Sequence, residues 1–217
     1  MMNKTRKVYV VGMGTGYANP IKNKQLVNTI QEADIVLFTG GADVDPSIYG
    51  KKAIEATWPN LRRDIYEKEF YEAMRPDQLA IGICRGLQLF CALNGGNLVQ
   101  DTTNHAGPDH TVKILETGDI FMVSSLHHQM VYPFDMSNSD YTILGISEHN
   151  RSRYYAGDGI DPDVIKNFGE PEIVLFHKEG KPVSFGIQGH PEMMSPNSLF
   201  VQYENEMIEK LLKQIKG

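Results

Sequence analysis

Apolar runs alternate with amphipathic stretches through the first half of the chain. Strands are predicted at KVYVVGMG (residues 7–14), DIVLFTGG (34–41) and QLAIGI (78–83), each ending close to glycine. Helices are predicted over residues 19–34, 59–76 and 85–96, with proline or glycine at or after the last two ends. This alternation predicts an α/β fold with a mainly parallel sheet and helices on both faces.

The second half of the chain has a different pattern. Shorter strands joined by turns are predicted over residues 110–133 and 141–157, and a hairpin over 171–189 around Glu179-Gly180. An amphipathic helix is predicted for residues 198–217. The stretch 150–169 is the most loop-like. No internal repeat or linker interrupts residues 1–217, so we expect one domain.

Composition narrows the choice of partner and compartment. The net charge is −6 and no stripe of Lys and Arg stands out, which disfavours nucleic acid as a partner. No apolar run approaches the ~20 residues of a membrane span, and the apolar part of the N-terminus is too short for a signal peptide. The two cysteines lie seven residues apart on one predicted helix, too far to bridge, so we expect a reducing cytoplasm.

One cysteine lies between two glycines in GICRG (residues 82–86), where a predicted strand meets a predicted helix. This G-x-C-x-G pattern is the thiol counterpart of the G-x-S-x-G turn that presents a nucleophile. Small residues two positions before and after it let strand and helix pass closely. The helix N-terminus favours a thiolate at Cys84, and the backbone amide of Arg85 would point toward an oxyanion.

The alternative interpretation treats Cys84 as a small buried apolar residue. Its flanking glycines and its place at the strand–helix junction favour the nucleophile. Cys91 has neither feature, since it lies in mid-helix between Phe90 and Leu93. We therefore expect Cys91 to be a core residue.

A cysteine hydrolase needs a base that takes up the thiol proton and returns it to the leaving amine. His190 is the best placed of seven histidines: it follows a predicted strand, Gly189 allows close approach, and Pro191 fixes the turn. Glu192 could hold the imidazole in one tautomer. A purely polar turn at GHPE remains the alternative.

The other histidines give weaker evidence for a functional role. His105 and His110 could bind a metal together with nearby aspartates, but their spacing matches no firm pattern. We expect a solvated loop there, and no metal site. His127 and His128 would point to opposite faces of a strand and could not hold one ion together.

Three further signals have structural interpretations. Glycines 12, 14 and 16 follow G-x-G-x-G rather than G-x-G-x-x-G, which indicates a turn lining the pocket and no dinucleotide cofactor. Asp45-Pro46 predicts a helix N-cap followed by proline at the first helical position. An exposed helix face with i,i+4 ion pairs is predicted for Arg62, Arg63, Asp64, Glu67 and Lys68.

The chain resembles the class I glutamine amidotransferase-like superfamily in six segments that occur in the same order. They are FTGGADVDPSIYG, RRDIYEKEF, GICRGLQLF, GGNLVQD, SLHHQMV and GIQGHPEM. It is most similar to the gamma-glutamyl hydrolase (peptidase C26) branch, which includes gamma-glutamyl-gamma-aminobutyrate hydrolases. The opening VVGMGTGYANP and the stretch between His149 and Pro171 depart from that branch, so the resemblance does not specify the amine released.

The resemblance implies a flavodoxin-like sheet and a catalytic triad that falls on Cys84, His190 and Glu192. It also implies an oxyanion hole formed by the backbone amides of Gly41 and Arg85. Substrate contacts are implied for Gln88 and for the backbone of Leu126, His127 and His128.

These observations predict a cysteine hydrolase that cleaves a γ-glutamyl amide through a γ-glutamyl thioester on Cys84, without metal or organic cofactor. The first alternative is a glutamine amidotransferase subunit that delivers ammonia to a partner synthetase. The second is a non-catalytic scaffold or ligand-binding protein of the same fold. The expected partner is a small γ-glutamyl substrate, not nucleic acid or membrane, and the sequence leaves a homodimer open.

Overall fold

The computed structural model describes residues 5–12 and 14–217. The first four residues, part of the segment considered as a signal peptide, and Met13, inside the predicted strand 7–14, lie outside the described residues. Within the described part, a nine-stranded sheet has the order β2-β1-β3-β4-β13-β12-β10-β7-β8. Its strands are β1 (Arg6–Val11), β2 (Lys24–Leu26), β3 (Ile35–Phe38), β4 (Leu79–Ile83), β7 (His110–Ile114), β8 (Ile120–Val123), β10 (Tyr141–Ser147), β12 (Pro171–Phe176) and β13 (Ser184–Ile187).

The sheet has a parallel half and an antiparallel half. Five neighbouring strands, from β2 through β1, β3 and β4 to β13, run parallel. The strands β12, β10, β7 and β8 add to β13 in antiparallel pairs. Two small antiparallel sheets lie beside them, one of β5 (Asn97–Val99) with β9 (Met130–Tyr132) and one of β6 (Asp101–Thr102) with β11 (Tyr155–Ala156). The parallel half and the β12–β13 hairpin confirm the α/β prediction.

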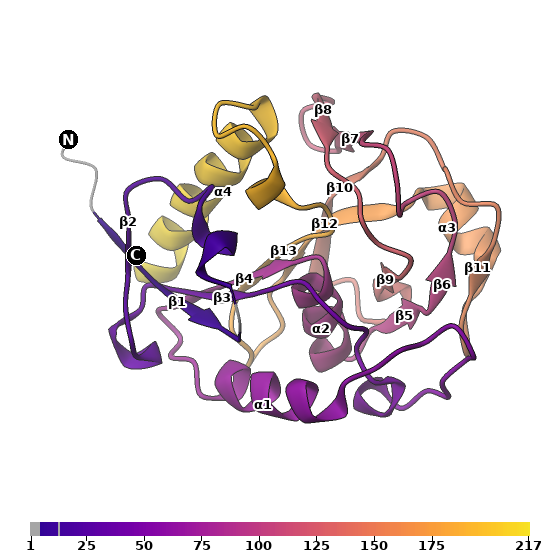
Figure 1. Ribbon diagram of the computed structural model, residues 1–217, viewed down its shortest axis with the longest axis horizontal. Helices are drawn as coiled ribbons and strands as arrows, with labels where there is room; N and C mark the ends of the chain where they lie inside the picture. The colour runs from indigo at the N-terminus through magenta and orange to yellow at the C-terminus, as the bar shows by residue number, and fades with distance from the viewer. Residues whose placement is uncertain (1–4, 13) are drawn as a thin grey trace.

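Helices cover both faces of the sheet. In Figure 1, α1 (Leu61–Glu72) and α2 (Arg85–Asn94) lie on one side of it and the long α4 (Leu199–Lys216) on the other. A short helix, α3 (Pro162–Phe168), lies near β11 at the end farthest from the chain's ends. The remaining turns of helix are 3₁₀: η1 (Thr15–Ala18), η2 (Ile30–Glu32), η3 (Pro46–Tyr49), η4 (Pro133–Asp135) and η5 (Pro191–Met193).

The two-sided core follows from alternation along the strands. In β3, Ile35 and Leu37 belong to the cluster that includes residues of α4, whereas Val36 and Phe38 belong to the cluster that includes residues of α2. Successive side chains of a strand point to opposite faces, so an uninterrupted apolar run serves a sheet covered on both sides. This burial holds the carboxyl ends of β3, β4 and β13 in fixed positions.

The predicted helix over residues 19–34 is wrong. The segment instead contains the edge strand β2, which pairs in parallel with β1, and the turn η2. Pro20 restricts the local backbone and Asn23 adopts a left-handed conformation with φ 53°. Ile30 and Ala33 are buried, whereas Leu26 is exposed on the edge strand.

Two other local predictions need correction. The stretch 150–169, interpreted as loop, contains β11 and α3; Asp161 accepts a hydrogen bond from the Asp163 backbone, and Pro162 takes the first position of the helix. The predicted exposed face of α1 is partly buried, because Asp64 and Glu67 are fully enclosed. Asp45 caps η3 by accepting a bond from the Ser47 amide, as predicted.

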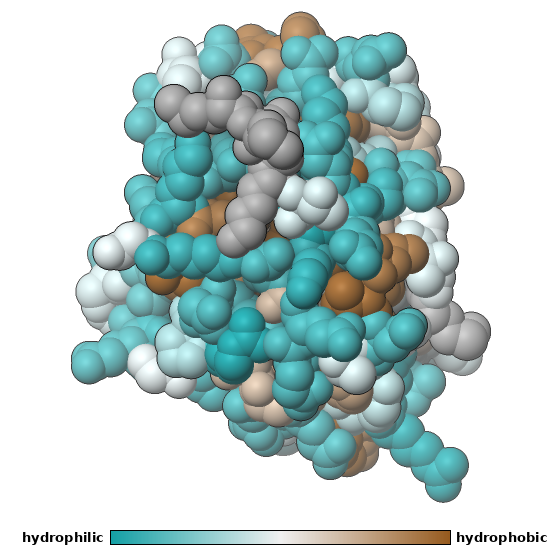
Figure 2. Space-filling view, turned by 90° about the vertical axis from the view of Figure 1, so that its left-hand side faces the viewer, coloured by the Kyte–Doolittle hydropathy of each residue, from teal (hydrophilic) through white to brown (hydrophobic). Residues whose placement is uncertain are grey.

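One face of the molecule and the helices were compared for their hydropathy. Figure 2 shows that the face at the left of Figure 1, where the chain ends lie, is largely hydrophilic with separate hydrophobic areas. Within the described residues, no helix combines the length and apolar character needed to cross a bilayer.

Candidate active site

Cys84 occupies a strained turn between β4 and α2. Its backbone has φ 53° and ψ −106°, a conformation that a residue other than glycine rarely adopts. The flanking glycines are required for packing: a Cβ on Gly82 would lie 2.5 Å from the Gly86 carbonyl carbon, and one on Gly86 would lie 2.4 Å from the Phe38 oxygen. Strand and helix therefore meet closely enough to hold the thiol at the sheet's carboxyl end, as predicted.

His190 and Glu192 lie against this turn. The Nδ1 atom of His190 donates a hydrogen bond to Oε1 of Glu192 over 2.7 Å. Burial opposes the charged imidazole, but its interactions with Cys84 and Glu192 prevail and raise the pKa of His190 to about 10. The structure thus brings together the three residues predicted as a triad, with a charged imidazolium favoured beside the Cys84 sulfur.

The backbone around His190 is fixed from the end of β8. The Ser124 hydroxyl donates to the His190 carbonyl and accepts from the His190 amide, both over 2.8 Å. A Cβ on Gly189 would lie 2.7 Å from the Ser124 carbonyl oxygen. Gly189 therefore permits the close approach that sequence reasoning expected of it.

Sequence reasoning missed Gln188, although it lies inside a motif that carried the resemblance. Its Nε2 donates to the Cys84 sulfur over 3.6 Å. Gln88, the predicted substrate contact, donates through Nε2 to Gln188 Oε1 over 3.3 Å and to the Gln129 carbonyl over 3.2 Å. Two buried glutamines thus connect the thiol to the segment 126–129. The buried position beside the strand end is the signal that could have identified Gln188.

The N-terminal turn also reaches the site. The Tyr17 ring on η1 lies 6.3 Å, centroid to centroid, from the His190 ring. Burial raises the pKa of Tyr17, and the charges of Glu192 and Cys84 raise it further. A Cβ on Gly40 would lie 2.9 Å from the Tyr17 hydroxyl and 3.1 Å from His190 Cε1. The turn predicted from residues 12–16 therefore leads to one wall of the site.

The predicted oxyanion donors lie at two element ends. Gly41 follows β3 with φ 139°, and a Cβ there would lie 2.1 Å from the Arg63 guanidinium. Arg85 begins α2, so its backbone N–H has no acceptor within the helix. Both amides therefore lie at element ends on the carboxyl side of the sheet, and their role as oxyanion donors stays a prediction.

The Arg85 side chain has a role that sequence reasoning missed. It is fully buried and forms ion pairs with Asp64 and Glu67 of α1. Glu67 also pairs with Arg63, whose Nη2 donates to the Thr39 and Gly40 carbonyl oxygens. This arginine–carboxylate network (Arg63, Asp64, Glu67, Arg85) ties α1 to the loop after β3 and to the start of α2.

The segment around Leu126 is a loop between β8 and β9, in agreement with the short strands joined by turns predicted over residues 110–133. The His127 amide donates to the His105 carbonyl, and the Gly107 amide to the Ser125 carbonyl. In this pairing the N–H and C=O groups of Leu126 point away from the loop that contains His105. Leu126 is half exposed, so its backbone polar groups remain open to a ligand more readily than those of His127.

The adjacent histidines 127 and 128 have different surroundings. His128 lies 3.1 Å from Asp43 through Nε2 and 3.3 Å from Asp101 through Nδ1. These two carboxylates raise the pKa of His128. His127 is buried, and desolvation lowers its pKa to about 4. The two residues do not share a site, as expected, although the reason is the loop geometry.

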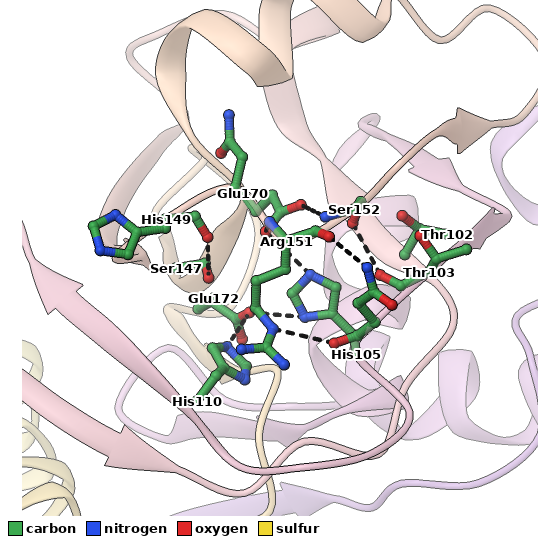
Figure 3. A network of polar contacts seen from close by, with 12 residues as sticks. Thr102, Thr103, His105, His110, Ser147, His149, Arg151, Ser152, Glu170 and Glu172 are labelled. Atoms are coloured by element: carbon green, nitrogen blue, oxygen red, sulfur yellow. Dashed lines mark hydrogen bonds and ion pairs between the residues drawn. The ribbon is translucent and has the colours of Figure 1, made fainter.

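The predicted solvated loop containing His105 and His110 is wrong. Both imidazoles are buried and lie against Glu172 at the start of β12 (Figure 3). His127 approaches the same carboxylate, with Nε2 4.0 Å from Oε1. His105 also bonds to Glu170 through Nε2 over 3.1 Å. Burial opposes ionisation of Glu170, but its bonds with His105 prevail and lower its pKa to about 2. The antiparallel strand β12, which places both glutamates here, was not part of the site predicted from sequence.

A shallow groove of about 560 Å³ runs beside the triad. Its lining includes Ser124, which anchors His190, and Met193, which follows Glu192. Ile120, Met122, Leu126, Met193 and Leu199 give this groove exposed apolar side chains. The groove extends from the site toward α4.

Cys91 behaves as predicted for a core residue. It is fully buried in α2, and its thiol donates to the Asn97 carbonyl over 3.3 Å. Desolvation raises the pKa of this thiol. Both cysteines are free, so the expectation that they do not bridge is confirmed.

The fold and part of the sequence match known proteins. A glutamine amidotransferase from Thermotoga maritima has a similar structure, with a TM-score of 0.55 at 13% identity over 98% of this chain and 95% of that one. The glutamine amidotransferase-like protein YvdE of Lactococcus lactis is 29% identical over 140 residues, which cover 51% of this chain and 56% of YvdE. The protein NtpR of Enterococcus hirae is 30% identical over 126 residues, covering 46% and 52%.

These comparisons define the class as class I glutamine amidotransferase-like. The Peptidase C26 family pattern matches residues 6–139, and the chain belongs to that family. The chain spans about half the length of the first curated relatives that it matches.

Proposed function

We propose that this protein is a glutamine amidotransferase-type hydrolase that cleaves γ-glutamyl amide bonds through a thioester on Cys84. The observation that carries this proposal is the meeting of a strained, helix-capping cysteine with the His190–Glu192 pair. Membership of the Peptidase C26 family supports the reaction class. Both thiols are free, so we expect the enzyme to act in a reducing cytoplasm.

The reaction would proceed in two steps. The Cys84 sulfur attacks the γ-carbonyl carbon, and the carbonyl oxygen becomes an oxyanion facing the Gly41 and Arg85 amides. His190 gives its proton to the leaving amine as the C–N bond breaks and the thioester remains. Water then attacks the thioester, His190 takes a proton from it, and free glutamate leaves as the C–S bond breaks.

Glu192 and Gln188 would support this chemistry in different ways. Glu192 accepts from His190 Nδ1, which leaves Nε2 to exchange the proton with sulfur and amine. Gln188 donates to the sulfur and would stabilise negative charge there. We expect Gln88 and the Leu126–His128 backbone to contact the γ-glutamyl group.

The decisive experiment offers a panel of γ-glutamyl amides, glutamine among them, to the purified protein without any partner. Mass spectrometry measures glutamate and each released amine, and hydroxylamine traps the thioester as a γ-glutamyl hydroxamate. Turnover of substituted amides that Cys84→Ser abolishes supports the hydrolase. Absence of both turnover and hydroxamate with folded protein contradicts it.

An amidotransferase subunit remains the second candidate, and the apolar groove beside the triad favours it specifically. Its exposed Met122, Met193 and Leu199 form an apolar surface of the kind that a partner protein would cover. Activity restricted to glutamine, slow in isolation, would favour this candidate. Introduction of a charge in the groove by Met122→Glu would then impair partner-stimulated turnover and leave basal glutaminase activity unchanged.

A further inference from the structure

The buried histidine cluster, comprising His105, His110, His127 and Glu172, has no role in the proposed reaction. Its members come from the loop before β7, from β7, from the loop after β8 and from β12. Figure 3 shows His105 lying between Glu170 on one side and the Glu172–His110 pair on the other. Each side chain of the cluster is at most 1% exposed.

Three imidazole nitrogens converge on one carboxylate oxygen. Oε1 of Glu172 lies 2.8 Å from His110 Nε2, 3.5 Å from His105 Nδ1 and 4.0 Å from His127 Nε2. In a tetrahedral site with metal–ligand bonds of about 2.0–2.2 Å, neighbouring ligand atoms are about 3.4 Å apart. The observed distances bracket that separation.

The imidazole rings of His127 and His105 are each oriented by a partner on the side away from Glu172. His127 Nδ1 lies 2.8 Å from the Gln129 carbonyl, which can only accept, so Nδ1 carries the proton and Nε2 carries a lone pair. His105 Nε2 faces Glu170 Oε2, which leaves Nδ1 directed at Glu172. A carboxylate or carbonyl that orients a histidine in this way is typical of metal ligands.

Glu170 is itself fixed in place. It accepts from the backbone amides of Arg151 and Ser152 and from the Tyr155 hydroxyl, over 2.8–3.0 Å. The orientation of His105 therefore depends on a rigid carboxylate, not on a mobile one.

The inward-facing atoms lack partners. Among the described residues, none forms a hydrogen bond with His105 Nδ1, His127 Nε2 or Glu172 Oε2, although all three atoms are buried. Such groups are costly to bury unpaired. One proton on His105 would satisfy its contact with Glu172 and leave His127 Nε2 without a partner, whereas a single cation at the centre would be a partner for both ring nitrogens and for the carboxylate. The buried Nδ1 of His110, across its ring from Glu172, lacks a partner within the described part of the chain in either case.

We propose that the buried histidine cluster binds one divalent transition-metal ion, with Zn²⁺ the best match. Nitrogen donors disfavour Ca²⁺ and Mg²⁺, which take oxygen ligands. A +2 ion would also balance the charges of Glu170 and Glu172. His105, His110 and Glu172 offer ligand atoms that lie within 4.8 Å of one another. His127 Nε2, 4.0 Å from Glu172 Oε1, is the group positioned to complete a tetrahedral site, so we infer a structural ion and not a catalytic one.

The ion would hold together the loops and the strand that lie beside Cys84. It would fasten the loops containing His105 and His127 to β12. The backbone N–H of Gln188, which directly follows β13, donates to the Glu172 carbonyl, so β12 is in turn bonded to the strand end beside Cys84. The segment Leu126–Gln129 would thereby be fixed in place. This inference stands apart from the proposed function, because it concerns metal binding alone.

The test uses the full chain, produced without a histidine tag in zinc-supplemented medium and passed through metal-free buffer. We expect elemental analysis to find one Zn²⁺ per chain, and chelation to lower the melting temperature until Zn²⁺ is restored. Chelated protein titrated with Co²⁺ should develop the intense visible absorption of tetrahedral cobalt, saturating at one equivalent.

Variants locate the site. Glu172→Gln should abolish the tetrahedral cobalt spectrum, and Glu170→Gln, which replaces no metal ligand but alters the carboxylate that orients His105, should weaken Zn²⁺ affinity about 10–100-fold. His149→Ala, an exposed histidine nearby, is the matched control and should bind normally. Because Glu172→Gln could unfold the protein, the metal content and the cobalt spectrum of the wild type are sufficient to test the proposal. Folded wild-type protein that contains no stoichiometric metal and gives no tetrahedral cobalt spectrum would overturn the proposal in favour of a protonated ion-pair network.

Discussion

The Gln188 side-chain amide donates to the Cys84 sulfur over 3.6 Å from the strand next to the one that precedes the cysteine turn. Parallel pairing of β4 with β13 fixes this relationship, since Ile83 lies opposite Ile187 immediately before the two residues. A donor placed there stabilises negative charge on sulfur. The sheet register therefore bears directly on the reactivity of the thiol.

Replacing Gln188 with Leu should slow both turnover and alkylation of Cys84 by about tenfold to a hundredfold, the worth of a hydrogen bond to a charged group. Iodoacetamide kinetics and γ-glutamyl amide hydrolysis are measured on the same preparation. Gln202→Leu, on the exposed side of α4, is the control and should change neither rate. Unchanged alkylation in a folded Gln188→Leu variant would show that the amide does not act on the sulfur.

The two thiols should react very differently. Cys84 lies at a helix N-terminus beside an imidazolium, whereas burial and the raised pKa of Cys91 leave that thiol protonated. Brief treatment with limiting alkylator followed by peptide mapping should label Cys84 almost alone. Predominant labelling of Cys91 would remove the basis for the nucleophile.

His190 should be the base, and its pKa of about 10 sets the pH range. Because the folded-state pKa lies above the ordinary value of 6.5, the imidazolium persists through neutral pH and is lost as pH rises through about 10. Alkylation and turnover of the wild type should therefore keep the benefit of the charged His190 imidazolium up to that pH. Glu192→Gln removes one interaction that raises this pKa, so the alkaline limit should move to lower pH.

Single mutants distinguish which histidine acts as the base. His190→Ala should lower turnover by at least about 10²–10⁴-fold, while His128→Ala should retain proton transfer. A fully active His190→Ala enzyme, together with an inactive His128→Ala enzyme, would place the base in the loop after β8. Both variants are assayed across pH, with circular dichroism as the check on folding.

The strongest patterns were readable from sequence. The apolar runs at β3 and β4 predicted buried parallel strands, because both their faces are covered. The glycines around Cys84 predicted the turn, because only small residues allow the close approach of Gly82 to Gly86. Local chemistry of this kind is independent of the distant parts of the chain.

Long-range contacts could not be read in this way. The antiparallel strand β12 carries Glu172 to histidines more than forty residues away in sequence, and no spacing rule connects them. The buried face of α1 carries Asp64 and Glu67, which resemble surface residues until Arg85 is placed against them. The edge strand β2 formed because β1 offers a parallel partner, which outweighs the local helical pattern.

Arg85 should matter more for stability than for chemistry. Arg85→Ala would leave Asp64 and Glu67 buried without their partner, and breaking such a pair typically costs about 3–5 kcal/mol. Urea denaturation measures the free energy of unfolding. The control is Lys68→Ala, which removes a surface pair with Glu72 and should cost no more than about 0.5 kcal/mol. Equal stability losses in the two variants would contradict the role of the buried network.

Glu204 should make the protein less stable as pH rises. It is fully buried in α4, and burial together with the charge of Glu192 raises its pKa to about 8, against a smaller opposing effect of Arg6. The folded state therefore holds a proton that the unfolded chain loses above about 4.5, so the free energy of unfolding falls between about pH 4.5 and pH 8. For one group the slope is at most about 1.4 kcal/mol per pH unit.

Glu204→Gln keeps the shape of the protonated acid and cannot ionise. We expect it to match the wild type near pH 4.5 and to be the more stable protein at pH 8, as measured by urea denaturation at half-unit pH intervals. Glu206→Gln, two residues along on the exposed side of α4, should follow the wild-type curve throughout. Parallel curves for Glu204→Gln and the wild type would mean that Glu204 is ionised in the folded protein at neutral pH. The carboxylate would then need a compensating charge, and Arg6, whose guanidinium also contacts Asn205 and Glu209, is the group positioned to supply it.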